Sequence, residues 1–315
     1  MATVMTRYPA SFLTLADLTP YHVADLLDLA DTMAHAGANK WVDTFRGRSL
    51  AMIFEKPSTR TRVSFEAAAQ RLGMLPIALN PNELQLGRGE TIEDTTRVLS
   101  RYAAAIVVRT FSQDLLGRMA DVATVPVINA LSDAHHPCQA LADLLTIRQL
   151  VGPMSGAHLA YVGDGKDNVV HSLMEAAALT GMRLTIACPS GYRPSPAVEI
   201  STRHLAATTG ASIEVVSEPS EAVHGADAVY TDVWVSMGEE SMRDARMRTL
   251  APYRVTPELM ARAKPGALFM HCLPAHRGEE VLDEVIDAPT SAVWQQAGNR
   301  LYTEQALLYR LILGS

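Results

Sequence analysis

The chain has 315 residues, 48% of them hydrophobic, and a formal net charge of −7 at pH 7. This length suits two domains of moderate size, each with a substantial core. The acidic balance argues against nucleic acid or an anionic membrane as a partner, although a local cationic cluster can still bind a small anion.

The cysteines and the N-terminal segment indicate the compartment. Cys138, Cys188 and Cys272 lie far apart in the sequence, which argues against a disulfide framework and for a reducing compartment. The N-terminal segment lacks the uninterrupted apolar core of a secretion signal, and no apolar run approaches the roughly 20 residues that a membrane span needs. We therefore expect a soluble cytoplasmic protein.

Short apolar runs alternate with amphipathic patterns along the chain. In the first half, strands are expected at 49–55, 75–80, 104–109 and 125–130, with helices such as 91–102 and 113–123 between them. In the second half, strands are expected at 158–165, 183–189, 212–218, 227–234 and 266–274, with helices such as 168–181 and 256–264. The runs are continuous rather than alternating, which is typical of parallel strands covered on both faces.

This order of elements predicts the α/β class, with two tandem domains that are each a parallel sheet covered by helices. Glycine and proline gather at 151–158, directly after a helical pattern over Pro137–Leu150. We expect a first domain at 1–150 and a second at 151–297. A C-terminal helix at about 298–315 is expected to pack back on the first domain.

Polar clusters mark the expected ligand sites. They follow Phe54, Val162, Tyr230 and Met270, at the ends of predicted strands. Ligands of open parallel sheets bind beyond the carboxyl ends of the strands. The sequence therefore predicts an active site in the interdomain cleft.

The stretch FEKPSTRTRVSFE, residues 54–66, joins the first strand to a helix. Ser58 or Thr59 would cap this helix, whose N-terminal N–H groups and dipole attract an anion. Arg60 supplies a planar fork that matches a phosphate group. The alternative is an ordinary cap with solvated arginines. Four consecutive donor side chains, ending at Thr61, exceed what one cap needs, and first-turn cations oppose the helix dipole. We therefore favour a phosphate site.

Segments spread over nearly the whole chain resemble one protein family. STRTR, at 58–62, resembles the carbamoyl-phosphate loop of the transcarbamylases, and HPCQALADL, at 136–144, resembles their second carbamoyl-phosphate segment. DVWVSMGEE, at 232–240, HCLPAHRGEE, at 271–280, and the stretch 84–102 resemble the ornithine carbamoyltransferase branch. The motifs occur in the family's order and at similar spacing, and together they are far more specific than any one alone.

The segment HHPCQ, at 135–139, contains two histidines and a cysteine. Its spacing does not match a paired-ligand zinc motif, and the ordinary alternative is a helix start with Pro137 in the first turn. The resemblance implies that His136 donates to the carbamoyl oxygen and that Gln139 contacts the carbamoyl nitrogen. Arg109, at the end of a predicted strand, is a second donor suited to an oxygen on which charge develops.

The segment GDGKDN, at 163–168, follows a predicted strand and precedes a helix. Its G-x-G invites a dinucleotide interpretation, but Asn168 stands where the fingerprint needs its third glycine. The resemblance implies instead that Asn168 binds the α-amino and carboxylate end of an amino acid. Family members commonly carry Asn where this chain has Asp167.

The segment DVWVSMG, at 232–238, follows another strand. A helix-capping loop is the ordinary interpretation. The resemblance implies that Asp232, Ser236 and Met237 hold ornithine, and that the segment after them closes over it.

Cys272 follows a predicted strand, between His271 and His276. A Cys–His hydrolase and a buried structural thiol are both alternatives. The resemblance implies a third role, in which Cys272 lies beside the δ-amino group with Asp232. The Leu273 carbonyl then contacts the carbamoyl nitrogen. Arg300 would orient the carbamoyl group, in a segment where the family usually has Glu in place of Gly298.

The resemblance implies an ornithine carbamoyltransferase of arginine biosynthesis, in which residues 1–150 bind carbamoyl phosphate and residues 151–297 bind L-ornithine. Neither a metal nor an organic cofactor is expected. A homotrimer is implied, with Gln85 reaching the neighbouring subunit's site. The alternatives are a transcarbamylase for another acceptor, such as putrescine, aspartate or an acylated ornithine, and a non-catalytic relative that binds carbamoyl phosphate only.

Overall fold

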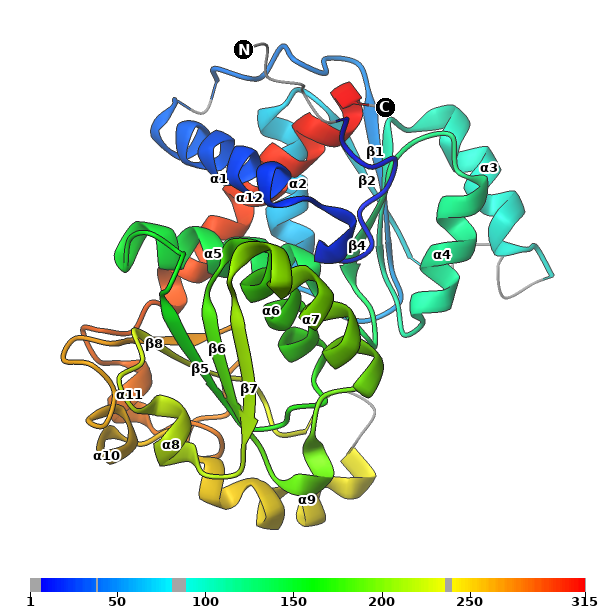
Figure 1. Cartoon of the computed structure of the whole chain (residues 1–315). Helices are drawn as coiled ribbons and strands as arrows, with labels where there is room; N and C mark the ends of the chain where they lie inside the picture. The colour runs from blue at the N-terminus through cyan, green and yellow to red at the C-terminus, as the bar shows by residue number, and fades with distance from the viewer. Residues whose placement is uncertain (1–6, 38, 81–88, 236–239, 315) are drawn as a thin grey trace. The chain divides into compact units, whose positions relative to one another are not determined.

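The computed structural model describes residues 7–37, 39–80, 89–235 and 240–314 (Figure 1). The chain forms two compact units, one of residues 1–142 with 299–315 and one of residues 143–298. The first boundary lies inside helix α5, Pro137–Leu150, whose last residue was the predicted boundary. The second lies inside helix α12, Val293–Gly314.

The first unit is built on a parallel sheet with the strand order β2-β1-β3-β4. Its strands are β1 Ser49–Phe54, β2 Leu75–Leu79, β3 Ala105–Arg109 and β4 Val127–Leu131. Its other helices are η1 Leu15–Asp17, α1 Pro20–His35, α2 Arg60–Arg71, α3 Ile92–Tyr102 and α4 Gln113–Val122. Figure 1 shows α3 and α4 on one side of this sheet and α2 and α12 on the other.

The core of this unit explains which strands are buried. Ala51 and Ile53 of β1 and Ile106 and Val108 of β3 pack with apolar residues of α3 and α4. The expectation of strands covered on both faces is confirmed for β1, β3 and β4 but is wrong for β2. There Leu75 is 63% exposed: β2 is an edge strand, whereas β4, at the opposite edge, is buried and also pairs with Phe12 through an isolated bridge.

The second unit contains a five-stranded parallel sheet with the order β7-β6-β5-β8-β9. Its strands are β5 His158–Val162, β6 Arg183–Ala187, β7 Ser212–Val216, β8 Ala228–Thr231 and β9 Leu268–His271. Its helices are α6 Asn168–Thr180, η4 Ser190–Tyr192, α7 Pro196–Thr209, α8 Pro219–Val223, η5 Glu240–Met242, α9 Arg243–Leu250, η6 Ala251–Tyr253, α10 Pro257–Met260 and α11 Asp283–Ile286.

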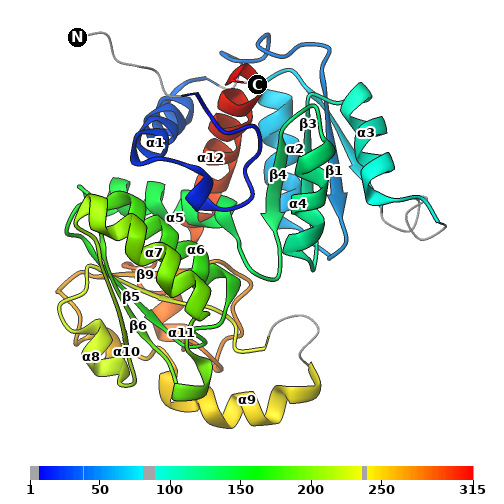
Figure 2. The ribbon, with the colours of Figure 1, turned by 45° about the vertical axis from the view of Figure 1, so that its right-hand side comes forward.

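Helices cover both faces of the second sheet. Figure 2 shows α6 and α7 on one side of it and α8, α10 and α11 on the other. Ala160 and Val162 of β5 belong to the core with α8 and α11. Helix α10 is shorter than the predicted 256–264, and edge strand β7 is again half exposed. Within the described ranges, no helix has both the length and the apolar character to cross a membrane.

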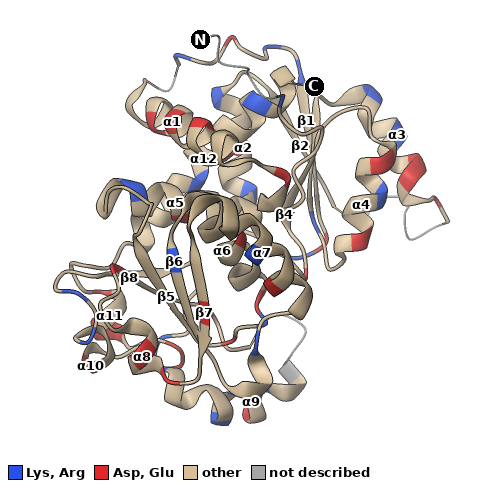
Figure 3. Ribbon diagram, in the orientation of Figure 1, with Lys and Arg blue, Asp and Glu red and all other residues tan. Residues whose placement is uncertain are grey.

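Charged residues are distributed over both units. Figure 3 shows basic and acidic segments interspersed in each of them. The net charge of −7 is therefore spread along the chain, and the field at any one site depends on the side chains that gather there.

Candidate functional site

In the first unit, the candidate residues gather where β1 and β3 end. These strands are neighbours, but the chain leaves β1 toward β2 and leaves β3 toward β4, so the loops diverge at this point of the sheet. Phe54 is aligned with Arg109, and the Glu55 N–H donates to the Arg109 carbonyl at 2.9 Å. The end of β3 is thereby fixed beside the loop that leads into α2.

The loop at 55–59 places hydroxyl and guanidinium groups together. Arg109 Nη1 lies 3.4 Å from Ser58 Oγ, and Arg60 is the first residue of α2. The expected side-chain cap is wrong, because Thr59 is the N-cap residue but makes no capping hydrogen bond. Its φ of −82° and ψ of −58° are already helical, whereas a capping side chain needs extended backbone. The Thr59 hydroxyl is thus not consumed by the cap.

Arg300 organises the buried part of this site. Its Nη1 donates to Gln139 Oε1 at 2.8 Å, and its Nη2 donates to Thr61 Oγ1 at 3.0 Å. Its Nε and Nη2 donate to Glu304 Oε1 at 2.9 and 2.7 Å. The guanidinium therefore holds residues of α2, α5 and α12 in one arrangement.

Burial and neighbouring cations set the charge state of His136. The side chain lies just before α5 and is 5% exposed. Desolvation lowers its pKa well below the usual value, and Arg300, Arg109 and Arg60 lower that pKa further. The imidazole is therefore neutral at physiological pH and can donate one N–H without carrying a charge.

Glu304 contacts Arg300 and is a candidate site residue that the sequence analysis missed. Desolvation raises its pKa to about 7, against the lowering effect of Arg300. The available signal was its place one helical turn after Arg300, a spacing at which side chains meet. Cys138 lies nearby, where its thiol donates to the Asn129 carbonyl at 3.3 Å and burial raises its pKa. That thiol is a structural group rather than a nucleophile.

In the second unit, the corresponding divergence of loops lies between β5 and β8. Asn168 begins α6, and the Asp167 side chain caps that helix by accepting the Val169 N–H at 2.8 Å. The glycines of GDGKDN have a steric explanation. Gly163 has a φ of +143°, and a Cβ at Gly165 would lie 2.5 Å from the Tyr192 carbonyl oxygen.

Asp164, in the same loop, forms a buried ion pair with Arg246 of α9. Arg246 also donates from Nε to the Trp234 carbonyl, and Trp234 is fully buried. These contacts fix the chain directly after Asp232.

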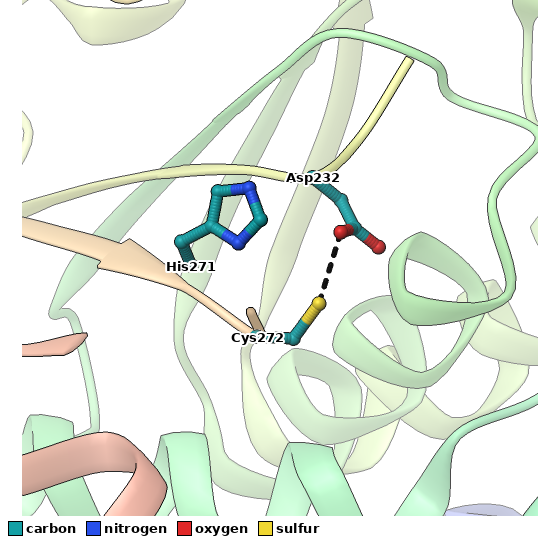
Figure 4. Close-up of side chains that lie close together, drawn as sticks. All are labelled: Asp232, His271 and Cys272. Carbon is teal, nitrogen blue, oxygen red and sulfur yellow. Dashed lines mark hydrogen bonds between the residues drawn. The ribbon is translucent and has the colours of Figure 1, made fainter. Parts of the chain in front are cut away.

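Asp232 and Cys272 meet at the ends of neighbouring strands β8 and β9 (Figure 4). The Cys272 thiol donates to Asp232 Oδ1 at 2.9 Å, and the same oxygen accepts the Val233 N–H at 2.8 Å. Desolvation raises the pKa of Asp232 despite the opposing effect of His271. Desolvation and the Asp232 charge raise the pKa of Cys272 well above its usual value. At neutral pH, Cys272 is a protonated hydrogen-bond donor to a carboxylate.

His271 is occupied by other partners. Its Nδ1 accepts the Leu273 N–H at 2.8 Å, and its Nε2 lies 3.2 Å from Glu280 Oε1. Leu273 has a φ of 60°, in the left-handed region that non-glycine residues rarely adopt. The Cys–His hydrolase alternative therefore lacks its pair at His271, because the Cys272 thiol contacts the Asp232 carboxylate and both ring nitrogens of His271 are engaged.

Asp232, His271 and Cys272 could also be considered as metal ligands, since one atom from each lies within 4.8 Å of the others. Coordination there would require the Cys272 thiol to release its proton, so binding would weaken as the pH falls. Three further predicted residues, Gln85, Ser236 and Met237, lie outside the described residues.

Comparisons with known proteins also divide the chain into two parts, although the second family model continues through residues 299–311, which belong to the first compact unit. Residues 10–149 match the model of the aspartate/ornithine carbamoyltransferase carbamoyl-P binding domain, and residues 155–311 match that of the Asp/Orn binding domain. The chain is 50% identical over 302 residues to the ornithine carbamoyltransferase of Anoxybacillus flavithermus, and 52% identical over 303 residues to that of Acidothermus cellulolyticus. Each alignment covers 96% of both proteins.

A solved structure gives the same result. The ornithine carbamoyltransferase of Pyrococcus furiosus superposes with a TM-score of 0.92 at 47% identity, covering 96% of this chain and 97% of that one. Matches of this extent, over both domain models and nearly the full length, show that the chain belongs to the aspartate/ornithine carbamoyltransferase family.

Proposed function

We propose that this protein transfers the carbamoyl group of carbamoyl phosphate to the δ-amine of L-ornithine, giving L-citrulline and phosphate. The observation that carries the proposal is the arrangement around Arg300, which fixes Thr61 and Gln139 beside the buried neutral His136. The names of the relatives support ornithine as the acceptor.

The first unit is suited to the anionic substrate. The N-terminus of α2, with Ser58, Thr59, Arg60 and Thr61, provides hydroxyl, guanidinium and backbone donors for the phosphate. Arg109, His136 and Thr61 are the donors for the carbonyl oxygen, on which negative charge develops during attack. Gln139 and Arg300 orient the carbamoyl group. Because carbamoyl phosphate is already activated, this mechanism needs no cofactor.

The neutral state of His136 has a mechanistic consequence. A neutral imidazole can donate its N–H to the carbonyl oxygen and keep that proton throughout the reaction. Its lowered pKa also means that it does not add a fourth positive charge beside Arg60, Arg109 and Arg300. The site therefore stabilises the oxyanion by fixed donors, with little reorganisation during the reaction.

The second unit is suited to the amino acid. We assign the α-amino and carboxylate end of ornithine to Asn168, with Ser236 and Met237, and the δ-amine to Asp232 and Cys272. An alkylammonium has a pKa of roughly 10 and must lose a proton before it attacks. Asp232 is the candidate proton acceptor, and its raised pKa makes it a better base than an ordinary carboxylate. The protonated Cys272 thiol holds Asp232 Oδ1 in place, and the Leu273 carbonyl is assigned to the carbamoyl nitrogen.

We further propose that the active form is a homotrimer, in the cytoplasm, that serves arginine biosynthesis, with Gln85 completing the neighbouring subunit's site. Exposed apolar residues at the edge of the first unit support an interface: Leu75 and Ile77 lie on β2, and Val63 lies on the adjacent α2. Sedimentation should give three times the chain mass. A mass equal to one chain would contradict the proposal that Gln85 completes the site of a neighbouring subunit.

The deciding test is a citrulline assay with carbamoyl phosphate and ornithine, run in parallel with putrescine, aspartate, lysine and N-acetylornithine. We expect ornithine to have the highest kcat/KM. Preference for another amine would contradict the assignment of the acceptor residues but not that of the carbamoyl-phosphate residues. Binding of carbamoyl phosphate without transfer to any amine would indicate a non-catalytic relative.

A further inference from the structure

A separate group of metal-ligating side chains lies in the loop that follows β9. His276, Glu279 and Glu280 each offer one ligand atom, and these atoms lie within 4.8 Å of one another. In the described part of the chain, His276 Nδ1, Glu279 Oε2 and Glu280 Oε2 are buried atoms with no hydrogen-bond partner. A buried polar atom without a partner is unfavourable, so three of them in one loop indicate a binding site.

The spacing of these atoms suits a small cation. His276 Nδ1 lies 3.7 Å from Glu279 Oε2, which is too far for a hydrogen bond. Two ligands that are each about 2.1 Å from a tetrahedral zinc ion lie about 3.4 Å apart. Small rotations of the two side chains would therefore bring both atoms into the coordination sphere of one ion.

The other oxygen of each carboxylate is already fixed. Glu280 Oε1 accepts the backbone N–H of His276 at 2.5 Å and lies 3.2 Å from His271 Nε2. Glu279 Oε1 pairs with the Arg243 guanidinium. Contacts of this kind orient metal ligands and are a regular part of metal sites. They leave the second oxygen of each carboxylate directed to the same place as the His276 ring.

The solvent exposure and the charge of these three side chains also suit a divalent cation. The His276 side chain is 42% exposed and that of Glu279 is 22% exposed, while Glu280 is fully buried. The ligand atoms themselves are buried, so an ion would enter by rotation of the partly exposed His276 and Glu279 side chains. Two carboxylates and one imidazole are ligands typical of zinc, and a fourth position remains for water. Arg243 offsets part of the negative charge, so we expect moderate affinity.

We propose that His276, Glu279 and Glu280 bind Zn²⁺ or a similar first-row divalent cation, in the pattern H-x-x-E-E. The ion takes no part in carbamoyl transfer, and the proposal does not rest on that activity. Because Glu280 also contacts His271, and His271 accepts the Leu273 N–H, a bound ion would fix the segment 271–280.

The test uses the full chain, freed of any affinity tag and of metal, titrated with zinc chloride by calorimetry and with cobalt chloride by optical spectroscopy. We expect one ion per chain, with visible d–d bands and no thiolate-to-cobalt band in the near ultraviolet. His276→Asn and Glu279→Gln each remove a ligand. They should weaken binding by more than the about 10–100-fold that loss of a ligand's hydrogen-bond partner produces.

Two controls make the result specific. Glu284→Gln removes an exposed carboxylate of α11 and should leave the affinity unchanged. Cys272→Ser removes the thiol from the other possible ligand group, which consists of Asp232, His271 and Cys272. This variant should also leave the zinc affinity unchanged. A near-ultraviolet thiolate band, or loss of binding in Cys272→Ser, would place the ion at Asp232 and overturn the proposal. Absence of binding to the wild-type chain would overturn it as well. Circular dichroism of each metal-free variant checks that it is folded.

Discussion

The two units surround their candidate functional groups with charges of opposite sign. In the first unit, His136 is surrounded by Arg300, Arg109 and Arg60, which add to the effect of desolvation on its pKa. In the second unit, the acidic group Cys272 is surrounded by Asp232 and other carboxylates, which also add to desolvation. Burial favours the neutral form in both, but the first environment is positive and the second is negative.

This difference shows why the net charge of the chain predicted so little about its ligands. A positive environment stabilises a phosphate and a developing oxyanion, and a negative one stabilises an alkylammonium. Each unit is thus matched to one of the two proposed substrates by a few side chains. The remaining charges are spread over the surface, where solvent screens them.

The largest expected effect comes from removing the negative charge of Asp232 in the second unit. Asp232→Asn removes both the proton acceptor and the negative charge that holds the δ-ammonium. We expect kcat to fall by about 10²–10⁴-fold, the range typical of general base catalysis. In the wild type, kcat should also fall as the pH drops through the raised pKa of Asp232, because the protonated carboxyl cannot accept a proton.

Cys272→Ser is the matched variant, because it keeps a hydrogen-bond donor to Asp232. Its loss of kcat should be much smaller than that of Asp232→Asn. An equal loss in both variants would mean that the thiol has a chemical role of its own, and that the second unit is more than a negative environment.

The next effect tests the positive environment. Arg60→Ala should lower kcat/KM for carbamoyl phosphate by about 10²–10³-fold, as loss of a transition-state donor does. Arg62→Ala is the control on the same helix, since Arg62 is exposed and pairs with Glu66 at 2.8 Å. Direct calorimetry of carbamoyl-phosphate binding separates affinity from rate. Intact binding in Arg60→Ala would show that the N-terminus of α2 is not the phosphate site.

The sequence was sufficient for the parts of the structure that depend on local pattern. The predicted strands are all present, because continuous apolar runs bounded by turn residues favour buried parallel strands. Arg60, Arg109 and Asp232 lie at or just after the ends of those strands, which is where ligands of such sheets are expected to bind. The family motifs supplied the specific chemistry.

Other features depend on contacts between distant residues. The Thr59 cap was wrong because the backbone angles of one residue decide whether a side chain can cap, and sequence does not specify those angles. Tyr230, Asp143 and Gln296 are joined by hydrogen bonds in the second unit although they are far apart in the chain. No local sequence pattern predicts a hydrogen-bond network between residues so far apart in the chain.

A smaller effect concerns Glu304 in the positive environment. Its pKa is about 7 in the folded chain and near the usual 4.5 when unfolded, so the folded state binds more protons between these values. The resulting stability is fully present below pH 4.5 and is lost as the pH rises through 7. By linkage, the contribution is about 3 kcal/mol.

Urea unfolding of the wild type and Glu304→Gln, at several pH values between 4 and 8, measures this contribution. The unfolding free energy of the wild type should decrease more steeply with pH than that of the variant. Parallel curves would show that Arg300 keeps Glu304 charged throughout, and that the positive environment dominates over burial.

The smallest expected effect compares two stacked tyrosines within the second unit. Tyr161 and Tyr230 are aligned on β5 and β8, with ring centroids 6.1 Å apart. The Tyr230 hydroxyl donates to Asp143 at 3.2 Å and accepts from Gln296 at 3.1 Å. The buried Tyr161 hydroxyl has no hydrogen-bond partner within the described ranges. The same chemical change therefore removes a satisfied group in one case and an unsatisfied one in the other.

Tyr230→Phe should lower the unfolding free energy by about 1–3 kcal/mol, because it deprives buried Asp143 and Gln296 of a partner. Tyr161→Phe should instead leave the stability unchanged or raise it by about 1 kcal/mol, because the desolvation penalty disappears. Urea unfolding without ligands measures both. If Tyr161→Phe is the more destabilising, its hydroxyl contributes to the fold. If stability is unchanged but KM for ornithine rises, the hydroxyl is a ligand of the amino acid, and the negative environment contains a donor as well as carboxylates.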